Sequence, residues 1–111
     1  MAEKPLEWLG SARADLRAFP DEARREAGHE LFLVQLGEEP SDWKPLPDIG
    51  MGVNELRIHT GTEHRVIYVA KFAEAVYVLH AFEKRSRKTR PADLDLARKR
   101  FAALLRLRQE P

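Results

Sequence analysis

VNELRIHTGTEHRVIYVAKFAEAVYVLHAFE, residues 53–83, is the stretch that decides the fold. It contains three runs rich in Val, Ile, Leu, Tyr and Phe, namely Val53–His59, His64–Ala70 and Ala75–Glu83. Runs of this composition, bounded by turn residues, are typical of β-strands. Because parallel neighbours need long crossovers, the short turns between these runs favour antiparallel pairing. The stretch therefore predicts a three-stranded antiparallel meander.

The flanking sequence adds helices on both sides of the meander. Upstream, Leu6–Leu9 is interpreted as a short strand, and Ser11–Ala18 and Asp21–Leu36 as helices with apolar residues at helical spacing. Residues 38–52 are rich in proline and glycine and are interpreted as a loop. Downstream, Pro91 suits the first turn of a final helix.

The predicted order is β-α-α-β-β-β-α in a single domain of residues 1–111. This is an α+β fold, in which two N-terminal helices and one C-terminal helix cover one face of a small, mainly antiparallel sheet.

Composition excludes several classes of protein. The chain has no cysteine, which rules out disulfides, thiolate catalysis and cysteine-bound zinc. The N-terminus lacks the apolar run of a signal peptide, and no apolar segment approaches membrane-spanning length. We therefore expect a cytoplasmic protein without a membrane partner.

The formal net charge of +1 hides an asymmetry between an acidic first half and a basic second half. Such asymmetry indicates a polyanion site on the basic half. The alternative is that folding mixes the two halves and no basic patch results.

Strand alternation predicts which side chains share a face. Leu56 and Ile58 are expected to face the helices, which leaves Arg57 on the open face. Arg65 and Tyr68 point to opposite faces unless a bulge intervenes. In the last strand one face is expected to carry Val76, Val78, His80, Phe82 and Lys84. Arg57, Arg65 and Lys84 are thus predicted to converge on the open side of the sheet.

Five cations follow the last strand within seven residues: Lys84, Arg85, Arg87, Lys88 and Arg90. A strand fixes its last side chains against a sheet, so cations placed there form an organised anion site. Phosphate-rich nucleic acid is the expected partner, because charge neutralisation supplies most non-specific affinity for it. The alternative is a solvated turn without a ligand.

Four parts of the chain also occur together, in the same order, in a known group of proteins. They are Gly52-Val-Asn-Glu-Leu-Arg57, His64-Arg-Val-Ile-Tyr-Val69, Leu79-His-Ala-Phe-Glu-Lys-Arg-Ser-Arg-Lys-Thr89 and the closing helix. This set resembles the RelE/ParE superfamily of toxins, and most closely the HigB-like, phage Gp49-like branch of type II toxin–antitoxin systems. The resemblance covers most of residues 5–105 and implies a RelE-like fold.

The resemblance implies a ribosome-dependent mRNA endonuclease, or mRNA interferase, that inhibits translation without a metal or cofactor. In such toxins the ribose 2′-OH attacks the adjacent phosphate. By motif position, Arg57 and Arg65 are expected to clamp phosphate, since the planar guanidinium binds it in two places at once. Lys84 and Lys88 are expected to bind phosphate or to transfer protons. The residues expected to hold the RNA backbone are Arg85, Arg87 and Arg90.

The chain departs from the superfamily pattern in its acid–base groups. Several members use a Tyr or His near the C-terminus, but this chain has no Tyr after Tyr77 and no His after His80. Tyr68, His80 or a lysine is therefore expected to serve. His59 and His64 flank a turn, but no carboxylate stands at a suggestive spacing, and we predict no metal site there.

The resemblance also implies a partner. A cognate helix-turn-helix antitoxin protein is expected to cover the basic site, and the pair is expected to bind operator DNA. One alternative is a ParE-like, non-nucleolytic toxin that inhibits a protein such as DNA gyrase. Another is a degenerate phage protein that retains only partner binding.

Overall fold

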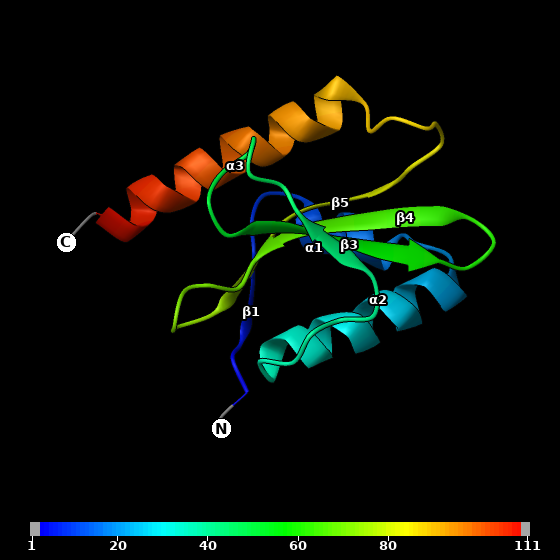
Figure 1. The fold of residues 1–111 in the computed structure, drawn as a ribbon, viewed down its shortest axis with the longest axis horizontal. Coiled ribbons are helices and arrows are strands. Elements are labelled where there is room, and N and C mark those ends of the chain that lie inside the picture. The colour runs from blue at the N-terminus through cyan, green and yellow to red at the C-terminus, as the bar shows by residue number, and fades with distance from the viewer. Residues whose placement is uncertain (1–2, 110–111) are drawn as a thin grey trace.

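The computed structural model describes residues 3–109, which form an α+β fold of three helices on a five-stranded mixed sheet (Figure 1). In chain order the elements are β1 (Leu6–Trp8), α1 (Ala12–Arg17), α2 (Asp21–Gln35), β2 (Trp43–Pro45), β3 (Val53–His59), β4 (Glu63–Val69), β5 (Val76–Glu83) and α3 (Pro91–Gln109). This confirms the predicted fold class and the order of its main elements. No helix among these residues is both long and apolar enough to cross a bilayer.

The strand order in the sheet is β1-β5-β4-β3-β2. The predicted meander is confirmed, since β3, β4 and β5 pair as antiparallel neighbours, and only β1 is parallel to its neighbour β5. The interpretation of 38–52 as a loop was wrong over Trp43–Pro45, which form the edge strand β2 against β3. Proline lacks an N–H and is tolerated at a sheet edge, so Pro45 does not prevent this pairing.

Helices cover both faces of the sheet, so the prediction that they cover one face was wrong. In Figure 1, α2 and α3 lie on opposite sides of the strands. The face toward α1 and α2 contributes Leu56, Ile58, Val66, Tyr68 and Val78 to one core. The face toward α3 contributes Val53, Ile67, Val69, Leu79 and Phe82 to another. A strand such as β4, buried from His64 to Val69, needs cover on both sides.

A bulge in β5 changes which side chains share a face. Ile67 of β4 pairs with His80, but the next residue, Tyr68, pairs with Val78, so Leu79 is the extra residue. The prediction that Val76, Val78, His80, Phe82 and Lys84 share one face was therefore wrong. Val76 and Val78 belong to the α1/α2 core, whereas Phe82 packs toward α3 and lies opposite Arg65.

Contacts along its length fix α3 against the sheet. Near its middle, Arg100 donates to the backbone carbonyl of Leu79 at 2.9 Å. At its C-terminal end, Arg108 stacks on Phe72, with the guanidinium carbon 3.6 Å from the ring centroid. Arg108 also bonds Glu74 and holds the pKa of that carboxyl down at about 2. These contacts hold α3 along the face of the sheet opposite α1 and α2.

Candidate nucleic-acid interface

The segment 84–90, here called the cation loop, connects β5 to α3 and is held by its own hydrogen bonds. The Lys84 N–H donates to the carbonyl of Glu63 at 2.7 Å, which ties the loop to the β3–β4 hairpin. The Lys84 ammonium donates to the carbonyl of Arg87 at 2.7 Å, and the Ser86 hydroxyl donates to that of Lys88 at 2.8 Å. The loop backbone therefore has a defined shape from which the cations project.

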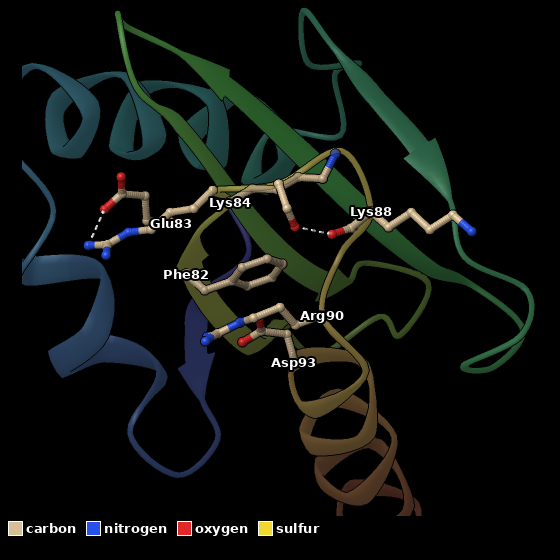
Figure 2. A pocket seen from close by; sticks show the side chains of 8 residues that line it. Phe82, Glu83, Lys84, Lys88, Arg90 and Asp93 are labelled. Atoms are coloured by element: carbon tan, nitrogen blue, oxygen red, sulfur yellow. Dashed lines mark hydrogen bonds and ion pairs between the residues drawn. The ribbon is translucent and has the colours of Figure 1, made fainter.

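Two clefts lie along the cation loop. The first, of about 220 Å³, is lined by Phe82, Glu83, Lys84, Arg85, Ser86, Lys88, Arg90 and Asp93 (Figure 2). The second, of about 350 Å³, is lined by Glu63, Arg65, Lys84, Arg85, Ser86 and Arg87. Because both contain Lys84, Arg85 and Ser86, the loop forms a shared wall with an electropositive hollow on each side.

The loop cations differ in how free they are to bind an anion. Arg85 pairs with Glu83 at 3.2 Å and Arg90 with Asp93 at 3.1 Å. In Figure 2, Arg90 lies along Asp93, whereas the Lys88 side chain extends away from both of these residues. Within residues 3–109, neither Arg87 nor Lys88 forms an ion pair, and both are exposed. Arg87 and Lys88 are therefore the most available of the loop cations to bind a phosphate.

Arg57 and Arg65 face each other across β3 and β4 on the face opposite Leu56 and Ile58, as the alternation predicted, but this face carries α3, so the prediction of an open face was wrong. Both are held by carboxylates. The Arg57 Nε donates to Glu55 Oε1 at 3.2 Å, and Arg65 Nη1 donates to Glu63 Oε1 at 3.1 Å. The Arg65 Nε lies 3.9 Å from the same Glu55 oxygen, an electrostatic contact too long for a hydrogen bond. The structure brings the two arginines together, but around a buried glutamate.

Arg65 and Lys84 line the same cleft, whereas Arg57 does not line either cleft beside the cation loop. The Arg65 side chain is only 7% exposed, against 32% for Arg57. The predicted convergence thus holds for Arg65 with Lys84, and Arg57 lies one strand further away.

Glu63 is shared with a histidine on the hairpin. The His59 Nδ1 lies 2.7 Å from Glu63 Oε1, and its Nε2 lies 2.6 Å from Asp42 Oδ2. Hydrogen bonds to Asp42 and Glu63 raise the pKa of His59, and His59 in turn lowers the pKa of Glu63. Across residues 3–109, no His, Cys, Asp and Glu cluster of three or more is arranged to hold a metal ion. His64 is on the opposite face, where its ring centroid lies 4.3 Å from that of Phe19.

Tyr68 lies far from the cation loop in the fold. Its side chain is buried in the core beneath α1 and α2, on the face opposite Arg65. Burial raises the pKa of Tyr68 to about 12. Its neighbours in a separate cleft include Trp43, Asn54 and Lys4. The structure does not bring Tyr68 together with Arg65, Lys84 or Lys88.

Comparison with known families places this site in context. The sequence pattern of the phage-derived Gp49-like protein family (DUF891) matches residues 14–102. The chain belongs to the Gp49-like family. This is a RelE/ParE-like toxin family, which agrees with the fold described above. No curated protein matches the chain.

In this Gp49-like protein, the structure adds Asp93 to the neighbourhood of the cation loop, as the partner of His80. The His80 Nε2 donates to Asp93 Oδ1 at 2.8 Å, and both side chains are more than nine-tenths buried. The other ring nitrogen, Nδ1, is enclosed without a hydrogen-bond partner, and the ring stacks on Phe82 with 5.0 Å between centroids.

The His80–Asp93 bond joins the strand before the cation loop to the helix after it, and so closes the loop at its base. Sequence reasoning weighed His80 as an acid–base group but missed Asp93, because an acidic residue in a first helical turn is ordinary. Only the β5 bulge turns His80 toward α3.

Proposed function

We propose that this Gp49-like protein is the toxin of a type II toxin–antitoxin system that cleaves mRNA on the ribosome. The observation that carries the proposal is the cation loop, whose fixed backbone separates two electropositive clefts. A target on the ribosome would place the protein in the cytoplasm, and a toxin of this kind would have a cognate antitoxin, proposed here as a helix-turn-helix protein. The toxin–antitoxin pair would bind its own operator DNA.

The proposed reaction is an in-line transesterification within the RNA. The 2′-oxygen forms a bond to the adjacent phosphorus, the bond from phosphorus to the 5′-oxygen breaks, and a 2′,3′-cyclic phosphate and a 5′-hydroxyl result. The 2′-OH proton passes to a base, and the 5′-oxygen gains a proton as it leaves. Cations near the phosphate stabilise the charge that develops on its oxygens.

The residues divide into three roles in this proposal. Lys88 and Arg87 meet the phosphate directly, because neither forms an ion pair within the described part of the chain. Lys84 and Arg65 line the adjoining cleft and add positive charge there. The residues that hold the flanking backbone are Arg57, Arg85 and Arg90. The proton-transfer groups that line the two clefts are Lys84, Lys88 and Asp93, and Asp93 is hydrogen-bonded to the buried His80; Tyr68 is not among them.

A second candidate is a non-nucleolytic toxin that inhibits a protein target such as DNA gyrase. The observation that favours it is the pairing of Arg57 and Arg65 with Glu55 and Glu63. Arginines held in this way have fewer N–H groups left for a transferring phosphate.

The test is induction of the protein alone, followed by mapping of mRNA 5′ ends. We expect cuts phased to codons, which fall about tenfold or more in Lys88→Ala, the effect of losing about 1.4 kcal/mol of transition-state stabilisation. Lys88 suits the test because its ammonium makes no contact that folding depends on. Lys99→Ala is the matched control, since Lys99 is exposed on α3 and lines neither cleft.

Each alternative has its own outcome. DNA damage with intact mRNA would replace the nuclease with the gyrase-type inhibitor, and the absence of any growth effect would leave only partner binding. Equal loss of cutting in Lys88→Ala and Lys99→Ala would show that the cation loop is not the site.

A further inference from the structure

Helix α1 carries two cations that the proposed site does not use. Arg13 and Arg17 lie four residues apart, so they project from the same side of the helix. Both are exposed, and within residues 3–109 neither forms an ion pair. They line a shallow hollow of about 600 Å³ together with Gly10, Ala14 and Ala18.

This hollow is connected to the cation loop through a further one. Ala18 also lines a hollow of about 360 Å³ that reaches His80, Phe82, Arg90 and Asp93. The last three also line the first cleft of the cation loop. The first cleft adjoins the second along Lys84, Arg85 and Ser86. Four hollows thus follow one another from α1 to the β3–β4 hairpin, and we call this series the basic groove.

The acidic residues along the basic groove already have hydrogen-bond donors. Asp15 accepts from the Ser11 hydroxyl at 2.7 Å, and Glu83 accepts from Arg85 at 3.2 Å. Asp93 accepts from both His80 and Arg90. By contrast, the groove cations Arg13, Arg17, Arg87 and Lys88 form no ion pair within residues 3–109. The groove therefore presents more N–H donors than acceptors to an anion.

The groove has no large exposed apolar side chain among the described residues. Within the described part of the chain, the exposed large apolar side chains are Phe32, Met51 and Leu107. None of these lines any of the four hollows. Protein interfaces bury apolar anchors at their centre, whereas polyanion sites are rows of exposed cations.

We infer that the basic groove binds the backbone of a single-stranded RNA over several nucleotides, with Arg13 and Arg17 of α1 holding phosphates beyond those at the cation loop. This inference rests on the proposed function, in that the RNA is the same molecule that the loop engages. It adds a second contact region, on an element that precedes the sheet in sequence. RNA that reaches α1 gains two phosphate contacts, and RNA confined to the loop does not.

The test measures binding of labelled oligouridylates of two lengths, about 4 and about 16 nucleotides, to the purified chain at several salt concentrations. In Arg13→Glu/Arg17→Glu we expect the longer RNA to lose about tenfold or more in affinity. Its slope of log affinity against log salt should fall by about 1.4, since each phosphate contact on a single strand contributes about 0.7. Binding of the shorter RNA should change less than about twofold, which is below the effect of one lost contact.

The control Arg25→Glu/Arg106→Glu makes the same change in net charge at exposed positions outside the groove. A loss equal to that of the α1 variant would assign the effect to net charge and overturn the inference. So would an equal loss for both RNA lengths, or no loss. Arg13→Gln/Arg17→Gln checks the result without introducing negative charge. Cleavage is scored separately, on mRNA bound to ribosomes: wild-type protein that binds the longer RNA more tightly but cuts no ribosome-bound mRNA would refute the nuclease and leave the groove standing.

Discussion

The substitution Glu55→Ala should lower the free energy of unfolding more than the removal of any exposed charged side chain. The Glu55 side chain is 4% exposed and lies between the guanidinium groups of Arg57 and Arg65, at 3.2 and 3.9 Å. Without its carboxylate, two like charges from adjacent strands face each other, and one of them, Arg65, is 7% exposed. A buried cation that loses its partner cannot recover full hydration.

The magnitude follows from the burial of the three side chains. Removing one partner of a buried ion pair costs about 3–5 kcal/mol. Arg65 keeps Glu63 at 3.1 Å and Arg57 is one-third exposed, so the lower end of that range applies. We expect the free energy of unfolding to fall by about 3 kcal/mol, which lowers the Tm by about 12 °C at about 4 °C per kcal/mol for a domain of this size.

The assay is urea and thermal unfolding followed by circular dichroism. Glu83→Ala is the matched control, because it removes the same group from an ion pair whose arginine is 82% exposed. Exposed pairs contribute at most about 1 kcal/mol. If the Glu55 and Glu83 variants lose the same free energy of unfolding, or if the Glu55 variant loses less than about 1 kcal/mol, the view of Glu55 as the buried anchor of both arginines is refuted.

Two further predictions concern stability. Gly50→Ala should lower the free energy of unfolding by about 1–3 kcal/mol, because the added methyl group would overlap the Phe101 ring. Gly28→Ala should raise it by about 0.5–1 kcal/mol, because Gly28 has open space beside it in α2. Urea unfolding of both variants checks this, and equal changes in the free energy of unfolding would contradict it. The free energy of unfolding should peak near pH 6.5, the ordinary pKa of both histidines. Carboxylate hydrogen bonds raise the pKa of His59, so the stabilisation from His59 is complete below pH 6.5 and is lost as pH rises through the folded-state pKa of His59. Burial lowers the pKa of His64, so the stabilisation from neutral His64 is lost as pH falls from 6.5 through the folded-state pKa of His64. His59→Gln should flatten only the alkaline limb in unfolding measured from pH 5 to 9, and a limb that stays unchanged would refute the assignment.

Local patterns in the sequence were sufficient for the meander, the helices and the α+β class. Strand and helix periodicities depend on residues close together in the chain, and these can be read without knowing the partners. The same holds for the cation loop, since its charges follow one another directly after β5. The alternation of β3 also predicted that Arg57 lies on the face opposite Leu56 and Ile58, which is confirmed, although it gave no sign that α3 packs on that face.

Tertiary structure decided what those residues meet. The bulge at Leu79 arises from the pairing of β5 with β4, and no local pattern marks it, yet it turns His80 toward Asp93. The partners of Arg57 and Arg65 depend on register between strands, which alone brings Glu55 between them. The placement of α3 on the second face depends on the burial of β4 on both sides. Helices and strands are thus specified by residues close together in the sequence. A charged site is formed by residues far apart in the sequence, and only tertiary packing determines which of its charges remain unpaired.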